Sequence, residues 1–255
     1  MMRSAATVAW YVLVEALRGG LPWLAGLCLL AVLGLAGFLS NVAITESAAL
    51  QASFGAALLR LCLAFLVATH VVASVAREAN DKGLELMLSL PISRPAYYLG
   101  KLLGFALAGM LLASLFSLPL LAWAKPVDVL AWWIALGAEA ALVAAAAMFF
   151  ASAMTQTVPA IAAVAGFYLL SRAMAAIQAI AAGPLSADTY GGQAARWAID
   201  ALALLLPRLD LVASGDWLLY GAPAPAELAA ALAGLGLFFA LLIAAGLFDF
   251  SRRNL

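Results

Sequence analysis

The chain has 255 residues, of which 67% are hydrophobic and 10% are charged, and its mean hydropathy is +1.09. Soluble domains contain about 45–50% apolar residues, so this composition excludes a soluble protein. The formal net charge is zero, and no basic patch indicates binding to nucleic acid. Cys28 and Cys62 lie far apart in apolar runs, which predicts neither a disulfide framework nor a thiol redox centre.

The first element in chain order is a short amphipathic segment. Residues 4–18 are too few and too charged to cross a bilayer, and Trp10 and Tyr11 are residue types that favour the membrane–water interface. We expect an in-plane elbow helix over residues 4–18 on the cytoplasmic face. Glu15 and Arg18 interrupt the apolar run before any cleavage site, so no removable signal peptide is expected.

Six later stretches are apolar and long enough to cross a hydrocarbon core of about 30 Å. They cover residues 21–39, 54–76, 97–123, 129–154, 158–182 and 227–248. The sequence therefore predicts an all-α integral membrane protein whose six transmembrane helices form a single domain over residues 1–255. Asp128 lies just before the fourth stretch and is expected to cap that helix.

The positions of Lys and Arg predict the orientation, because these residues favour the cytoplasmic side of a membrane. With the N-terminus inside, eight of the 13 are cytoplasmic and three are outside. We therefore expect both termini in the cytoplasm and a multi-pass protein of the inner, or cytoplasmic, membrane. The eight are Arg3, Arg18, Arg77, Lys82, Arg94, Lys101, Arg252 and Arg253; the three are Lys125, Arg196 and Arg208.

The segment between the last two spans, residues 183–226, is the one long external loop of this topology. Gln193, Arg196 and Asp200 mark one face of an otherwise apolar helix, and Arg196 and Asp200 form an i,i+4 pair. Residues 210–220 form a second short piece whose Trp217 and Tyr220 suit the lipid headgroup zone. We expect two short external helices here.

The stretch from Arg77 to Lys101 carries seven charges in 25 residues and cannot lie in a bilayer. Within it, Leu84, Met87 and Leu88 fall at i, i+3 and i+4, which gives a short helix one apolar stripe. Pro91 ends that helix. The spacing predicts a short helix outside the bilayer between spans two and three.

The same stretch, with Lys82-Gly83-Leu84-Glu85-Leu86-Met87-Leu88-Ser89-Leu90-Pro91-Ile92-Ser93-Arg94 and then Gly100-Lys101, resembles the first cytoplasmic loop of permease subunits of type-2 ATP-binding-cassette (ABC) transporters. The resemblance is close over these residues, and the rest of the chain is similar to that family in layout. It implies a coupling loop over residues 77–95 that docks on a separate ATPase. Leu84, Met87 and Leu88 would fill an apolar groove, Pro91 would end the helix, and Glu78, Glu85 and Arg94 would pair at the rim.

The resemblance also implies the partners. They are two copies of an ABC ATPase, a second copy of the permease as a homodimer, membrane lipid and an accessory periplasmic protein, with export as the direction of transport. The chain has no G-x-x-x-x-G-K-[ST] motif, so we expect no catalytic residues and no bound cofactor in it, ATP and Mg²⁺ being held by the ATPase.

Charged residues within the expected spans include Glu139, Arg172 and Arg60. Glu139 and Arg172 are equally far from the turn between spans four and five, so an antiparallel pair of helices places them at one depth, and we expect an ion pair there. Two roles stay open for this pair: a bridge that makes the two helices insertable, or a contact for substrate or gating. Arg60 is shallow enough that we expect it to snorkel outward.

Other functions remain open. An ion-gradient-driven secondary transporter or channel would use Glu139, Arg172 and His70 as coupling groups, although no inverted repeat is visible. A membrane scaffold is a further alternative, and so is an ABC permease for copper or enzyme maturation. The seven methionines are scattered without an M-x-x-M motif, so we expect apolar packing and no metal site. The cargo stays open.

Overall fold

The computed structural model describes residues 2–42, 47–81, 93–154, 156–183 and 190–252. Throughout these ranges the regular structure is helical, and six helices are long and apolar enough to cross a membrane, as expected. Those six are α2, α3, α5, α6, α7 and α10, with the short η1 helix continuing α5. The bounds are α1 Met2–Arg18, α2 Leu21–Val42, α3 Ser47–Asn80, α5 Arg94–Ser117, η1 Leu118–Ala122, α6 Pro126–Ala153, α7 Thr157–Ala181, α8 Tyr190–Leu205, η2 Leu209–Leu211, α9 Asp216–Tyr220 and α10 Pro225–Arg252.

The second spanning helix is longer than the apolar stretch that predicts it. α3 begins at Ser47 instead of residue 54, and it continues to Asn80. Its first two turns are stabilised by a contact with α2, because the buried Gln51 donates a hydrogen bond from Nε2 to the Ala36 carbonyl at 3.0 Å. A polar side chain in this connector therefore supports helix where hydropathy alone predicts a loop.

α6 lies at the centre of the bundle and contacts α3, α5, α7 and α10. Its buried positions combine the large Trp132 with a nearly continuous run of small residues from Ala144 to Ala147. Small side chains let neighbouring helices approach closely, which is the usual basis of helix packing in membranes. The central position of α6 brings its polar residues within reach of three other helices.

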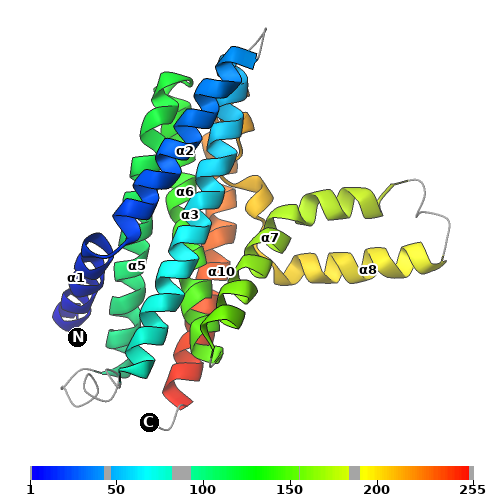
Figure 1. Cartoon of the computed structure of the whole chain (residues 1–255). Coiled ribbons are helices and arrows are strands. Elements are labelled where there is room, and N and C mark those ends of the chain that lie inside the picture. Colours follow the sequence, from blue (N-terminus) through cyan, green and yellow to red (C-terminus); the bar gives the residue numbers. More distant parts are fainter. Residues whose placement is uncertain (1, 43–46, 82–92, 155, 184–189, 253–255) are drawn as a thin grey trace.

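α1 packs along the first half of α5, at the end of the bundle where the N- and C-termini both lie (Figure 1). The contact depends on two glycines one turn apart. A Cβ atom added to Gly100 would lie 2.6 Å from the Ala5 carbonyl oxygen, and one added to Gly104 would lie 2.7 Å from Val12 Cβ. Only glycine permits this separation between the two backbones, so the sequence Gly100-x-x-x-Gly104 fixes where α1 docks.

The second half of α7 and α8 run side by side as a hairpin that projects sideways from the bundle (Figure 1). The chain then returns through residues 206–224, the α8–α10 connection, which contains η2 and α9. We expected Asp128 to cap α6, and this prediction is wrong: the helix begins at Pro126, with Lys125 at the N-cap. The Oδ1 atom of Asp128 instead accepts a hydrogen bond from the Ala222 backbone N–H at 2.7 Å, which attaches the connection to α6.

Candidate functional site

The segment that resembles an ATPase-docking loop falls largely outside the described residues. Leu84, Glu85, Met87, Leu88 and Pro91 all lie in the undescribed range 82–92, so the short helix over them stays a prediction. Both of its flanks are described, since α3 ends at Asn80 and α5 begins at Arg94. The contacts of these two flanks show which helices are joined to the ends of the segment.

Glu78, in the last turn of α3, is bound to the first turns of α5. One carboxylate oxygen accepts a hydrogen bond from Tyr97 Oη, and the other forms an ion pair with Lys101 Nζ. The side chains of Lys101 and Glu78 are only 7% and 19% exposed. The Lys101 ammonium also lies 5.9 Å from the centre of the Phe105 ring, within cation–π range. We call Glu78, Tyr97 and Lys101 the Glu78 cluster; it joins the two helices that flank the loop.

α1 adds a second tie at the same end of the bundle. Glu15 Oε1 accepts hydrogen bonds from Arg77 Nη2 at 2.9 Å and from Ser74 Oγ at 3.2 Å, so α1 is attached to α3 as well as packed on α5. Arg94, expected at the rim of an ATPase groove, lies beside α10 and donates from Nη1 to the Ser251 carbonyl at 3.4 Å. The described flanks of the loop are therefore connected to α1 and α10.

A cavity of about 330 Å³ opens beside the Glu78 cluster. It lies among the ends of α3, α6 and α10 and the beginnings of α5 and α7. Its walls are mostly apolar, with polar groups from the Glu78 cluster and from the turn between α6 and α7. The lining includes Val75, Glu78, Tyr98, Met148, Gln156 and Phe250.

Glu139 on α6 and Arg172 on α7 lie together, with Arg172 Nη1 3.9 Å from Glu139 Oε2. Glu139 is completely buried. Its other oxygen, Oε1, accepts a hydrogen bond from Tyr168 Oη at 2.7 Å. Oε2 has no hydrogen-bond partner among the described residues, so the attraction of the Arg172 guanidinium is what compensates its charge.

Arg172 is held mainly by backbone carbonyls of the α8–α10 connection. Its Nη1 atom donates to the Leu209 carbonyl and, at 2.7 Å, to the Val212 carbonyl. Arg60 on α3 binds the same connection, because its Nη1 atom donates to the Ala213 carbonyl at 2.6 Å. Both arginines thus attach the connection to the bundle, and the carbonyl dipoles compensate cations that lie within spanning helices.

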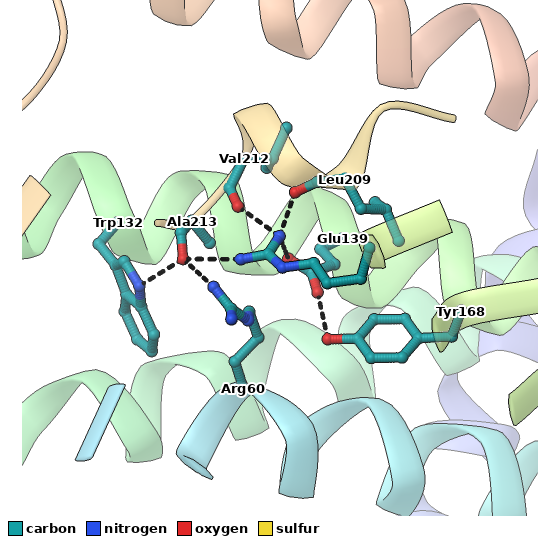
Figure 2. A network of polar contacts seen from close by, with 8 residues as sticks. Arg60, Trp132, Glu139, Tyr168, Leu209, Val212 and Ala213 are labelled. Atoms are coloured by element: carbon teal, nitrogen blue, oxygen red, sulfur yellow. Dashed lines mark hydrogen bonds and ion pairs between the residues drawn. The ribbon is translucent and has the colours of Figure 1, made fainter. Parts of the chain in front are cut away.

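The Ala213 carbonyl is the point on which three helices converge (Figure 2). It accepts hydrogen bonds from Arg60 on α3 at 2.6 Å, from Trp132 Nε1 on α6 at 3.0 Å and from Arg172 Nη2 on α7 at 3.4 Å. Ala213 is fully buried and has a φ of +48°, a left-handed conformation that non-glycine residues rarely adopt. The three donors offset the cost of that conformation. We call these side chains, with Glu139 and Tyr168, the Glu139 network.

The Glu139 network contains one carboxylate and two guanidinium groups, so its formal charge is +1. The two guanidinium groups donate to three carbonyl groups of the connection, those of Leu209, Val212 and Ala213. The arrangement suits a structural anchor, because both guanidinium groups donate hydrogen bonds to backbone carbonyls of the connection.

Sequence reasoning missed Tyr168, Trp132 and the carbonyl acceptors. A signal existed for the two side chains: Tyr168 lies one turn before Arg172, and Trp132 lies two turns before Glu139, each on the same helix face as its charged partner. Hydrogen-bonding aromatic residues at such spacing indicate a polar stripe inside a span. The carbonyl acceptors have no such signal.

His70 is placed apart from these groups. Its ring packs edge-on against Phe105 at a centroid distance of 5.9 Å, and its Nε2 atom has no hydrogen-bond partner within the described part of the chain. None of its described contacts is with Glu139 or Arg172. The three groups that a gradient-driven transporter was expected to couple are therefore not gathered in one described site.

The chain was compared with known protein families and with characterised proteins. No family model matches it, and no curated protein matches it.

Proposed function

We propose that the chain is the permease subunit of a type-2 ABC transporter, an exporter of the inner membrane. It would work as a pair of copies with two copies of a separate ATPase that holds ATP and Mg²⁺. The observation that carries the proposal is the run from Lys82 to Arg94, whose leucines, Pro91 and flanking charges resemble the ATPase-docking loop of that family.

The ties around this run support a mechanical role for it. Glu78 joins the end of α3 to the start of α5 through Tyr97 and Lys101, and Glu15 joins α1 to α3. A displacement of the loop would therefore be transmitted to α1, α3 and α5 together. In the proposed cycle, ATP closes the ATPase pair, the two docking grooves approach each other, and the loop carries this motion into the bundle.

The Glu139 network takes the structural role in this proposal. Arg60, Arg172 and Trp132 hold the α8–α10 connection against the bundle, and Glu139 compensates part of their charge. The outer half of the bundle is then a fixed frame against which the loop end can move. Neither Glu139 nor Arg172 is assigned to cargo.

The test is retention of an ATPase. The tagged chain is co-expressed in turn with each ABC ATPase subunit of its own organism, and the ATPase recovered per permease is measured after purification in detergent. We expect Met87→Asp combined with Leu88→Asp to lower the bound ATPase about tenfold or more, since buried apolar anchors dominate interfaces. The reconstituted complex should also lose cargo-stimulated ATP hydrolysis.

A matched control places the same kind of change elsewhere. Leu211→Asp introduces an acid at an exposed leucine in the α8–α10 connection and should leave ATPase retention unchanged. Equal retention of the ATPase by the Met87/Leu88 variant and the wild type would refute the docking role of the loop.

A gradient-driven transporter is the second candidate, and the buried Glu139 Oε2 without a hydrogen bond favours it. The two candidates differ in their energy source. Cargo movement in proteoliposomes that contain the permease alone, driven by an imposed ion gradient and abolished by Glu139→Gln, would select the second candidate. Movement that requires the ATPase and ATP would select the first.

A further inference from the structure

α8 has three different sides: one packs toward α7, one is apolar and suits lipid, and one mixes charged and apolar residues. Ile199 and Ala203 are half-buried on the side toward α7, where Gln178 Nε2 donates to Asp200 Oδ1 at 3.0 Å. A second side is wholly apolar and exposed, with Leu202 and Leu205, and suits contact with lipid chains.

The third side, the mixed face of α8, combines charge with large apolar groups. Its positions follow the helical repeat i, i+3, i+4, i+7 and i+11. Trp197 and Leu204 are 80% and 81% exposed, so the two apolar side chains of this face have almost no contact within the chain. Its members are Gln193, Arg196, Trp197, Asp200 and Leu204, and together with Ala201 they line one hollow on the surface.

Contact with lipid is unfavourable for the mixed face of α8. α8 lies along α7, one of the six helices suited to crossing a membrane, so the face lies at the level of the second half of α7. Arg196 forms no ion pair with any described residue, and an uncompensated cation in the hydrocarbon region costs about 2.5–3.5 kcal/mol. A headgroup layer would cover the charges, but it would leave Leu204 in a polar environment.

We infer that the mixed face of α8 is a contact surface for a second copy of this chain. Arg196 and Asp200 lie one turn apart on one face and carry opposite charges. Two such helices, antiparallel across a two-fold axis, place Arg196 opposite the partner's Asp200 and Asp200 opposite the partner's Arg196, because a two-fold contact is self-complementary. Trp197 then lies in the centre between the two ion pairs, and Leu204 adds an apolar contact one turn outside them, so that an apolar anchor is buried at the middle of the interface.

The inference rests on the proposed function in one respect: both proposals assume that two copies of the chain form a complex. It adds which surface joins the copies: the sideways hairpin of α7 and α8 acts as an arm that reaches a second bundle (Figure 1). No ATPase takes part in this contact, so the two proposals fail separately. Self-association is measured on the permease alone, whereas the docking test measures ATPase retention.

Charge reversal gives the sharpest test. The full chain, labelled at its C-terminus, is reconstituted in lipid bilayers, and the dimer fraction is measured by single-molecule photobleaching over a range of protein densities. Arg196→Asp and Asp200→Arg should each weaken dimerisation about tenfold, because each places like charges opposite one another. The double variant should restore the wild-type dimer fraction, since each copy again offers opposite charges.

Two controls separate the interface from the fold of the hairpin. Gln178→Ala removes the hydrogen bond to Asp200 without changing the mixed face, and Arg208→Asp reverses a charge outside α8. Both should dimerise like the wild type. Trp197→Ala should weaken dimerisation about tenfold, because an exposed tryptophan surrounded by polar residues is a typical binding hot spot.

Three results would overturn the inference. The first is a wild-type chain that stays monomeric at every density, and the second is a double reversal that does not restore the dimers lost in the single variants. The third is strong quenching of Trp197 by lipids brominated near the headgroup at densities where dimers predominate, measured as the difference from Trp197→Phe. That last result would assign the face to lipid.

Discussion

The Glu78 cluster joins side chain to side chain across two helices, whereas the Glu139 network joins side chains to the backbone of the α8–α10 connection. The Glu78 cluster lies at the end of the bundle beside an open cavity, and Glu78 keeps part of its surface exposed. Glu139 is fully buried. Water can replace a broken contact in the Glu78 cluster but not in the Glu139 network. We therefore expect the Glu78 cluster to tolerate rearrangement and the Glu139 network to keep its geometry.

The largest expected effect is that of Glu139→Leu. The change leaves Arg172 and Arg60 without a compensating carboxylate inside the bundle, and breaking a buried pair costs about 3–5 kcal/mol. The free energy of unfolding, measured by SDS titration in mixed micelles, should fall by that amount. Glu227→Leu, near the start of α10, is the matched control and should change it by less than about 0.5 kcal/mol. A similar loss for both variants would remove the distinction between the two regions.

Lys101→Met tests the Glu78 cluster with a side chain of similar length. Glu78 would keep its hydrogen bond from Tyr97 and lose a charged partner, which is worth about 1.5–3 kcal/mol. We expect a loss of unfolding free energy in that range and faster amide hydrogen exchange at the end of α3. A loss larger than that of Glu139→Leu would contradict the view that this end is the more adaptable one.

Trp132→Phe removes one of the three donors to the Ala213 carbonyl and keeps an aromatic ring. Since Arg60 and Arg172 still donate to that oxygen, the expected loss is about 1 kcal/mol of unfolding free energy. Trp23→Phe, at a tryptophan that is 85% exposed, provides the control and should cause no measurable loss. Equal values for both variants would show that the Trp132 hydrogen bond contributes nothing.

The smallest effect is expected for Arg77→Ala. The ion pair with Glu15 is largely exposed, and exposed pairs contribute about 0.2–1 kcal/mol that salt screens. The difference in unfolding free energy from the wild type should shrink as salt is raised in a neutral detergent. A salt-independent loss would indicate that Arg77 acts through packing instead.

Hydropathy and spacing were sufficient for much of this structure. Six apolar stretches gave six helices, and equal distance from one turn brought Glu139 and Arg172 to one level, because apolar length and helical rise are properties of the sequence itself. Helix bounds were less predictable: the start of α3 depends on Gln51 reaching the Ala36 carbonyl, a contact with a different helix.

The environment of the arginines was the least predictable feature. Depth in the membrane suggested that Arg60 would reach outward, but it did not indicate that the acceptor would be the backbone carbonyl of residue 213. Carbonyl groups are common to all residues, so no letter of the sequence marks Ala213 as an acceptor. Its left-handed backbone is equally hidden, because alanine rarely adopts it.

The shared Ala213 carbonyl has a consequence for motion. A slide of α3, α6 or α7 by one turn, about 5.4 Å, would carry its donor out of reach of the oxygen. The parts of these helices that lie near Ala213 are therefore held in register. A relative tilt of the three helices would keep these hydrogen bonds, and it would displace most the opposite ends of the helices, around the 330 Å³ cavity.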